Sequence, residues 1–489
     1  MTRLTRALAG AFLLLVAASC GTDDLSVRLT REQLLDPETC KGCHPKHYDE
    51  WSASMHAYAS RDPVFIAMNK RMQEQAPENA QFCVQCHAPM AVRENAIPNL
   101  SDPSTIPAHL QGVTCYFCHN VVDVKSEHFN ANLVLANDTI MRGALGNPVA
   151  SAAPHGVMPT SKWHDPSGIE SSQMCGTCHD IKAPSGKFIE RTFQEYEMSL
   201  SAQPGPGRFN SCSDCHMRPK PKEELAAVGV DGVGQRKVHS HLFPAVDIAL
   251  TPDMPNQDAL RQVIEKSELQ ACTLSMFEVE IGDWRPGEPF EFVAQVEHIA
   301  GHSIPSGAAA DRRMWLEFVA TDEAGQVVFK TGQIADGEVE EKPDTDPKYD
   351  PQFRPFRDHL IDKDGNETHM FWEAVDYKTD LMPYATDPNP AITHTAQRTF
   401  RGAPLLKVPV RMEGWIRLRP MGIDVLQDLV QSGHLDPAVI SAMPTLTVAH
   451  YEFVLNPSNQ TYKGQSLLTD AECKQFKTLS DVTAAQPQM

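Results

Sequence analysis

The 489-residue sequence lacks an excess of basic residues. Its 43 Lys and Arg face 63 Asp and Glu, which gives a formal net charge of −20 at pH 7. Nucleic-acid-binding proteins normally carry a basic face, so this charge argues against a nucleic-acid partner. Past the N-terminal segment, no apolar run reaches the roughly 20 residues that a membrane-spanning helix needs. With 41% hydrophobic and 22% charged residues, the chain is not broadly disordered and can bury a core.

The chain also has too few cysteines for a small disulfide scaffold. Thirteen cysteines are spread over 489 residues, and most of them are regularly placed. The length predicts roughly two to four domains, and the 37 prolines predict long irregular connections between elements.

The first twenty residues have the pattern of an export signal. Arg3 and Arg6 precede an apolar run, Ala7 to Ala18, that is too short to cross a bilayer. Small residues then lead into Cys20 and Gly21, which resembles a bacterial lipobox, where the peptide is cut before the cysteine and the thiol is lipidated. We predict an exported protein, periplasmic or at the cell surface, anchored to the outer membrane as a lipoprotein. An ordinary secreted protein is the alternative.

Ten of the thirteen cysteines lie in five copies of the motif C-x-x-C-H, which is the attachment site for c-type haem. The spacing lets two thiols form thioethers with one porphyrin, and the adjacent histidine then binds the iron as its proximal ligand. The cysteines are Cys40, Cys43, Cys83, Cys86, Cys115, Cys118, Cys175, Cys178, Cys212 and Cys215, and the histidines are His44, His87, His119, His179 and His216. We number these motifs as the first to fifth haem sites in chain order.

Two other readings of paired cysteines fit less well. Zinc sites also use C-x-x-C pairs, but zinc does not require a histidine directly after the second cysteine. Redox C-x-x-C pairs of the thioredoxin type lie in a βαβ unit. The sequence around the five motifs here does not show that pattern. The sequence therefore predicts five covalently attached haem c groups with their irons as cofactors.

The surroundings of these motifs resemble the multihaem cytochrome c superfamily, which includes the tetrahaem electron carrier of nitrifiers, pentahaem nitrite reductase and hydroxylamine oxidoreductase. The resemblance covers about residues 38–245. It rests on segments around Glu50-Trp51, the second to fifth motifs and Thr192 to Tyr196. In that group a histidine after Glu-Trp-x-x-Ser, and others just past the final motif, bind the far side of an iron. The resemblance implies this role for His56 and for His239 or His241.

Six-coordinate iron needs a second axial ligand, commonly histidine or methionine. Fifteen histidines remain after the five proximal ones, a supply sufficient for two histidines at every iron. The candidate distal ligands are His56, His128, His155, His164, His239 and His241. Each of them has the ordinary alternative of a surface or hydrogen-bonding histidine.

The two enzymes of the superfamily match less well than the electron carrier. The pentahaem nitrite reductases typically have one motif that ends in lysine, at the open catalytic iron, and here all five end in histidine. Hydroxylamine oxidoreductases have eight haems, and this chain has motifs for five. Electron transfer is therefore favoured over catalysis, and no catalytic residue is predicted.

Cys272 and Cys473 belong to no motif and are not part of the signal. An oxidising compartment permits a disulfide between them. The alternative is two unrelated buried thiols.

The sequence pattern in the second half of the chain is typical of strands rather than helices. Alternating apolar and polar residues predict strands at 290–297, 315–330, 408–418 and 446–455, with a short amphipathic helix from Ile423. We predict a multidomain protein: a mostly α, loop-rich haem domain followed by an all-β sandwich of immunoglobulin-like type. The predicted parts are a signal peptide (1–20), a linker (21–37), a pentahaem domain (38–245), a helical linker (246–271), the β-sandwich (272–460) and a tail (461–489).

The β part also contains Gly301-His302-Ser-Ile-Pro305-Ser-Gly307. This segment resembles a Gly-His-x-x-Pro-Thr-Gly signature in the β domains of some multihaem cytochromes, with serine in place of threonine. We expect His302 to stabilise its loop, and a role as a haem ligand is the alternative.

These observations predict a pentahaem electron carrier whose partners are donor and acceptor cytochromes or a membrane oxidoreductase, with the membrane contacted through the lipid anchor. A partner should be basic where it docks, because the chain is acidic. Two alternatives stay open: a multihaem reductase of a small nitrogen or sulfur oxyanion, and a binding protein whose sandwich docks a partner while the haems act as a relay.

Overall fold

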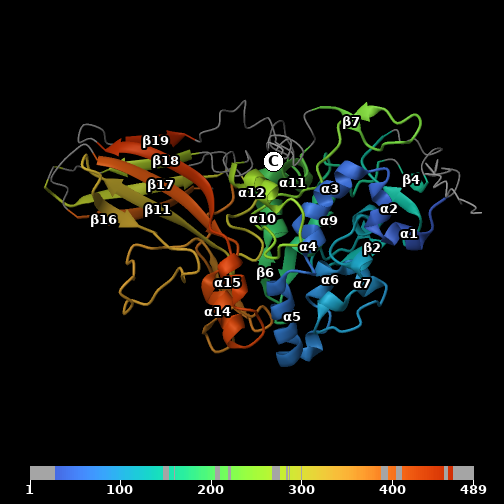
Figure 1. Ribbon diagram of the computed structural model, residues 1–489, viewed down its shortest axis with the longest axis horizontal. Helices are drawn as coiled ribbons and strands as arrows, with labels where there is room; N and C mark the ends of the chain where they lie inside the picture. The colour runs from blue at the N-terminus through green and yellow to red at the C-terminus, as the bar shows by residue number, and fades with distance from the viewer. Residues whose placement is uncertain are drawn as a thin grey trace, which may run out of the picture.

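The computed structural model describes residues 28–146, 154–158, 160–203, 210–218, 222–266, 276–281, 285, 287–298, 300–386, 395–403, 410–455 and 461–465. The predicted signal peptide with Cys20, and the cysteines Cys272 and Cys473, lie outside these ranges. Figure 1 shows a helical part built from the N-terminal half beside a β part built from the C-terminal half. This arrangement agrees with a multidomain chain in which helices precede strands.

The helical part consists of short helices joined by irregular loops. Proline occupies a first-turn position in several of them, where its missing N–H costs nothing. The α-helices are α1 (Arg31–Leu35), α2 (Pro37–Lys41), α3 (Pro45–Ala53), α4 (Met55–Tyr58), α5 (Pro63–Gln75), α6 (Val84–His87), α7 (Pro89–Arg93), α8 (Cys115–His119), α9 (Ile169–His179), α10 (Thr192–Met198), α11 (Cys212–His216) and α12 (Gln257–Lys266). The 3₁₀ turns are η1 (Pro77–Asn79), η2 (Pro103–Thr105), η3 (Ala108–Leu110) and η4 (Leu200–Ala202).

Small two-stranded sheets fill the gaps between these helices. They pair β1 with β2, β3 with β4, β5 with β6 and β7 with β8. The strands are β1 (Val121–Val124), β2 (Leu133–Leu135), β3 (Ile140–Arg142), β4 (Gly156–Met158), β5 (Asp180–Lys182), β6 (Phe188–Arg191), β7 (Glu224–Leu225) and β8 (Gln235–Arg236).

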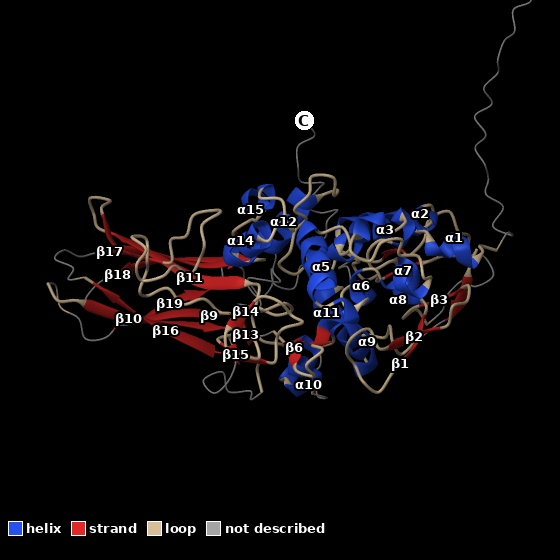
Figure 2. Ribbon diagram, turned by 90° about the horizontal axis from the view of Figure 1, so that it is seen from below, coloured by secondary structure: helices blue, strands red, loops and turns tan. Residues whose placement is uncertain are grey.

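The β part contains two four-stranded antiparallel sheets in the orders β16-β10-β9-β19 and β12-β11-β17-β18, and a three-stranded sheet in the order β14-β13-β15. Figure 2 shows the two larger sheets as separate layers. The strands are β9 (Met276–Ile281), β10 (Phe290–Glu297), β11 (Arg313–Thr321), β12 (Val327–Thr331), β13 (Asp358–Ile361), β14 (Glu367–Thr368), β15 (Asp376–Thr379), β16 (Thr395–Gly402), β17 (Val410–Arg419), β18 (Leu446–Leu455) and β19 (Thr461–Gln465).

Aromatic side chains join the two larger sheets. The ring of Phe292 on β10 lies 5.1 Å from that of Phe318 on β11, nearly perpendicular to it, and Phe318 lies 5.2 Å from Phe400 on β16. Such edge-to-face pairs stabilise a core beyond the area they bury. The alternation of buried and exposed residues along β10 places its apolar side chains in this core.

The helical and β parts share a hydrophobic core. Helix α14 (Ile423–Gln431) belongs to the C-terminal half, yet its buried Leu426 and Leu429 cluster with Val64 and Ala67 of α5. An ion pair of 2.7 Å between Arg71 and Asp428 reinforces the contact. A second short helix, α15 (Ala438–Ala442), extends the same cluster through Val439. The β part is thereby fixed against the helices rather than tethered to them.

The strands predicted at 290–297, 315–330, 408–418 and 446–455 coincide with β10, the β11–β12 hairpin, β17 and β18. Strand β19 extends the sheet to residue 465, five residues into the segment predicted as a tail, because it pairs with β9. Within the described residues, no helix is both long and apolar enough to cross a membrane. The immunoglobulin-like class of the β part stays a prediction.

Candidate haem-binding cavity

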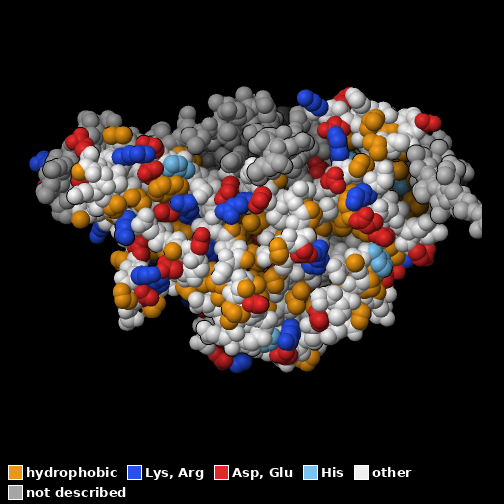
Figure 3. Space-filling view, viewed as in Figure 1, with side chains coloured by type: hydrophobic (Ala, Val, Ile, Leu, Met, Phe, Trp, Pro, Cys, Tyr) orange, Lys and Arg blue, Asp and Glu red, His pale blue; other side chains and the backbone are white. Residues whose placement is uncertain are grey.

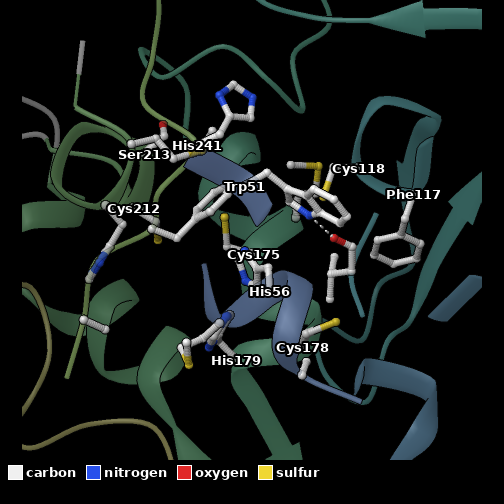
Figure 4. A pocket seen from close by; sticks show the side chains of 18 of the residues that line it. Trp51, His56, Phe117, Cys118, Cys175, Cys178, His179, Cys212, Ser213 and His241 are labelled. Atoms are coloured by element: carbon white, nitrogen blue, oxygen red, sulfur yellow. Dashed lines mark hydrogen bonds between the residues drawn. The ribbon is translucent and has the colours of Figure 1, made fainter. Parts of the chain in front are cut away.

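All five motif histidines line one continuous cavity of about 1170 Å³. Figure 4 shows cysteines and histidines of several motifs around it, with Trp51 from α3 anchored by a hydrogen bond from its ring nitrogen to the Val113 carbonyl. The β part contributes to the wall as well, through residues that include His302, Arg312 and Trp372. The cavity therefore lies where the two parts of the chain meet.

Four of the five motifs end a helix with their histidine. These helices are α6, α8, α9 and α11, and the first motif starts on α2 and finishes just beyond it. In a helix, residues three apart lie on the same face, so the two cysteines of a motif point to the same side. Ser211 begins α11 with a reciprocal capping box to Asp214, which fixes where the fifth motif starts.

The Nδ1 atom of each motif histidine faces an oxygen of the protein. This is the arrangement that orients metal-binding imidazoles, because it leaves Nε2 for the metal. The Nδ1–oxygen distances are 2.6 Å from His44 to Ala226, 2.9 Å from His87 to Ala59, 2.6 Å from His119 to Arg142 and 3.0 Å from His216 to Pro244, all to backbone carbonyls, and 3.7 Å from His179 to the Glu190 carboxylate.

Burial keeps most of these imidazoles neutral, which is the form that binds a metal. Burial lowers the pKa of His216 to about 4 and, together with nearby histidines, the pKa of His56 to about 3. His179 is the exception. Burial lowers its pKa, but the carboxylate of Glu190 and neighbouring thiols raise it further, to about 9. Thioether formation would remove the thiol charges and leave Glu190 as the charged neighbour of His179.

Four of the motif histidines have a second histidine ring opposite them. A histidine nitrogen lies about 2.0 Å from the metal it binds, so two imidazoles on opposite sides of one iron should have centroids about 6.3 Å apart. The observed centroid separations are 6.4 Å for His44 and His155, 6.1 Å for His119 and His241, 6.3 Å for His56 and His179, and 6.4 Å for His216 and His302. Figure 4 shows His56 and His179 close together in the cavity. The donor set and its spacing fit iron held between two imidazoles.

The second site differs from the other four. The ring that lies against His87 is Phe65 of α5, with centroids 4.1 Å apart and planes 7° apart. Phe65 thus covers one face of the imidazole, whereas an iron bound at Nε2 would lie in the plane of that ring. Among the described histidines, none takes up the opposing position that is filled at the other sites.

Three of the predicted distal candidates occupy other positions. The His128 ring packs edge-on against Phe193, with centroids 5.8 Å apart. The ring of His164 stacks on that of His119, with centroids 5.4 Å apart and planes 9° apart, which is closer than two imidazoles on one iron would lie, and its Nε2 atom lies 3.0 Å from the Cys118 carbonyl oxygen. His239 directs Nδ1 to the carbonyl oxygen of Met217, 2.7 Å away. His302, for which the sequence predicts a loop-stabilising role with haem ligation as the alternative, has its ring 6.4 Å from that of His216.

Cysteines of different motifs are direct neighbours. The thiols of Cys40 and Cys115, of Cys86 and Cys178, and of Cys175 and Cys212 lie close enough for each to shift the pKa of its partner. Cys178 also contributes to the raised pKa of Cys118. The first site is therefore a neighbour of the third, and the third is a neighbour of the fourth. The second and the fifth sites are also neighbours of the fourth.

Comparison with known proteins supports this reading of the cavity. Residues 39–120 match the family described as "Cytochrome c554 and c-prime". The fold is similar to the crystal structure of a penta-haem cytochrome c552 from Thermochromatium tepidum, with 16% sequence identity and a TM-score of 0.58, over 87% of this chain and 100% of that one. No curated protein sequence matches the chain. The five motifs, the family match over the first three of them and the shared fold together relate this chain to the multihaem c-type cytochromes.

Proposed function

We propose that the chain is a pentahaem c-type cytochrome that transfers electrons outside the cytoplasm. The observation that carries this proposal is the shared cavity, in which five motif histidines lie and four of them face a second histidine ring at 6.1–6.4 Å. The ten motif cysteines would hold the porphyrins as thioethers, and the motif histidines would bind the irons. Haem iron held in this way supplies one-electron transfer.

The positions of three predicted distal ligands support this role. His155 lies opposite the motif histidine of the first site, His241 opposite that of the third and His56 opposite that of the fourth. His155 and His241 each direct Nδ1 to a backbone carbonyl, at 3.1 Å in both cases. These contacts favour Nε2 as the iron-binding atom in both residues.

The neighbouring thiols support a continuous chain of haems for electron transfer. Adjacent attachment points bring the third, fourth and fifth sites into one sequence with the first, and the second site branches from the fourth. The carboxylate of Glu190 beside His179 would favour the more positive, oxidised form of the fourth site. The other motif histidines face neutral carbonyls instead, so the chain itself differentiates the sites.

The first experiment is mass spectrometry of the mature, acid-denatured protein from a host that matures c-type cytochromes. The expected mass includes five covalently attached haems. A mass with four or fewer would contradict the pentahaem proposal. Electron paramagnetic resonance of the oxidised protein then counts the irons that have two strong axial ligands.

Reduction of a small nitrogen or sulfur oxyanion is a second candidate function, and one observation favours it. Among the residues that the structure describes, no histidine ring takes the opposing position at His87 that is filled at the other four sites. A reductase needs an iron with a free position. Turnover of nitrite or hydroxylamine at a rate that matches electron delivery would favour this function over a relay.

The β part is the third element of the proposal. Its two packed antiparallel sheets support an immunoglobulin-like sandwich. One of its loops lines the cavity, which favours a role in building the haem sites over a role as a separate binding module. Figure 3 shows acidic and basic side chains interspersed over one face. The net charge of −20 nevertheless favours a redox partner with a basic docking patch.

The signal-like N-terminus supports export and a lipid anchor at Cys20. The variant Cys20→Ala should move the protein from the membrane fraction to the soluble fraction, because the acyl chains of a lipoprotein attach at that residue. Unchanged membrane association of the variant would contradict the anchor and leave the haem proposal untouched.

A further inference from the structure

The fifth haem site has an opposing imidazole that comes from the β part. The ring of His302 lies 6.4 Å from that of His216, and the two planes are 18° apart. This separation falls within the 6.1–6.4 Å range of the three pairs formed inside the helical part. His302 also lines the common cavity, so its free nitrogen is not walled off from the site.

Both rings are oriented in the manner of metal ligands. The Nδ1 atom of His216 lies 3.0 Å from the Pro244 carbonyl oxygen, and that of His302 lies 2.9 Å from the Ser303 carbonyl oxygen. Because Nδ1 of each ring is engaged with the backbone, Nε2 is left on each to bind a metal. A histidine that only stabilised its loop would not need the matching orientation across the cavity.

The loop that carries His302 is fixed to helix α10. The backbone N–H of Ser303 donates to the buried carboxylate of Glu195 at 3.0 Å. The hydroxyls of Ser306 and Thr192 lie 2.9 Å apart, and the N–H of Gly307 donates to the Thr192 hydroxyl at 3.2 Å. Three hydrogen bonds therefore hold the two ends of this short loop against a helix of the haem-binding part.

A second anchor lies on the other side of the loop. The Nε–H of Arg312 donates to the Ser306 carbonyl at 2.8 Å, and its terminal nitrogens form a two-pronged ion pair with Asp247 at 2.8 and 2.9 Å. Asp247 lies just past the haem motifs in the chain. Planar, bidentate pairs of this kind restrict orientation strongly. The loop is thus prepositioned before any ligand is added.

We infer that His302 is the second axial ligand of the iron at the fifth site, so that the β part completes a metal centre whose other ligands all come from the helical part. This inference rests on the proposed haem-binding function. The β part is then necessary for the ligation of one haem. The fifth site differs in this from the first, third and fourth sites, whose facing histidines all lie within residues 40–241.

The test uses the full-length, haem-loaded protein and the variants His302→Ala and His302→Met. His302→Ala should keep five haems by mass, convert about one iron in five from low-spin to high-spin in the electron paramagnetic resonance spectrum, and return to low-spin on addition of imidazole. His302→Met should keep the fifth iron low-spin and raise the reduction potential of that haem, because methionine ligation raises potentials.

The matched control is His239→Ala. His239 lies near the same site, since its Nδ1 faces the carbonyl oxygen of Met217, but among the described ring contacts it is His302 and not His239 that faces His216. Its replacement should leave the spin-state populations as they are in the parent protein. A new high-spin iron in His239→Ala together with an unchanged His302→Ala spectrum would overturn the inference.

The outcomes separate this inference from the haem proposal. If the parent protein carries fewer than five haems by mass, the haem proposal itself fails. If it carries five and the His302→Ala spectrum is unchanged, only the role of His302 fails. If His302→Ala does not mature, His302→Met decides: an unchanged set of five potentials would refute ligation by His302.

Discussion

The imidazole of His87 stacks on the ring of Phe65, with centroids 4.1 Å apart and planes 7° apart. This contact sets the second site apart from four sites where a second imidazole stands across the cavity. Because none of the described histidine rings takes the opposing position at His87, we expect the second site to be the place where an exogenous ligand binds.

The reduced protein should therefore bind about one carbon monoxide per five haems. The expected uptake follows from four irons with two histidines and one with a free position. Titration of the dithionite-reduced protein with carbon monoxide, followed in the Soret band, measures the stoichiometry. Uptake close to zero would mean that the second iron also has a sixth ligand, and the chain would then be a relay alone.

The variant His56→Ala should open the fourth site. His56 lies opposite His179 with centroids 6.3 Å apart, so its loss removes one imidazole from the fourth iron. Carbon monoxide uptake should rise from about one to about two per five haems, and one further iron should become high-spin. His128→Phe is the control, because the ring of His128 packs edge-on against Phe193. Uptake above one in that control would count against this assignment.

Glu340 and Arg419 form an ion pair in which both side chains are fully buried. The guanidinium group of Arg419 also donates to the Glu338 carbonyl at 2.8 Å and to the Thr445 hydroxyl at 2.9 Å. Glu340→Ala leaves this buried charge without its carboxylate, which should cost about 3–5 kcal/mol in the free energy of unfolding. Urea denaturation measures the loss.

The control for that pair is Glu291→Gln, which removes one partner of the exposed pair between Arg401 and Glu291. An exposed ion pair contributes little, since solvent screens it, so this variant should unfold at nearly the same urea concentration as the parent. Equal decreases in the free energy of unfolding of the two variants would show that burial does not determine how much an ion pair contributes to stability.

Asp311 should make the stability of the protein depend on pH. Its carboxyl is buried, and its Oδ1 has no hydrogen-bond partner among the described residues. Burial raises its pKa from 3.8 to about 7, against the opposing effect of Arg313. The folded state then holds a proton that the unfolded state has lost, so stability should fall as pH rises from about 4 to about 7, by on the order of 1 kcal/mol per pH unit.

Asp311→Asn removes the titrating group and should flatten this part of the pH profile. The measurement is urea denaturation at a series of pH values between 4 and 8. The exposed Asp344 provides the control, because Asp344→Asn should leave the slope of the parent protein unchanged. A slope that persists in Asp311→Asn would place the titrating group elsewhere.

The features that could be predicted from the sequence are those in which chemistry or burial requires residues at a fixed local spacing. The five motifs follow from a covalent requirement, and the strands at 290–297 and 446–455 follow from an alternating pattern that one buried face imposes. Strand β9 and strand β16, in contrast, are recognisable mainly through their pairing with β10. The pairing of β10 with β16 joins residues that are far apart in the chain, such as Phe290 and Gly402.

The distal positions show why counting histidines was insufficient. The fifteen histidines outside the motifs exceed the need, yet ligation depends on which ring stands opposite which site, a long-range property of the fold. His239 and His241 lie two residues apart, and only His241 has its ring across from His119. His302 reaches the fifth site because Glu195 and Thr192 hold its loop there.

The thiol neighbours also bear on how the protein is assembled. Cys40 lies beside Cys115, Cys86 beside Cys178 and Cys175 beside Cys212, so each close pair joins two different motifs. In an oxidising compartment, a chain that folded before receiving its porphyrins would bring together thiols that should never be crosslinked. If the proposed haems are attached, we expect maturation to keep these cysteines reduced and to attach the porphyrins before the chain closes around them.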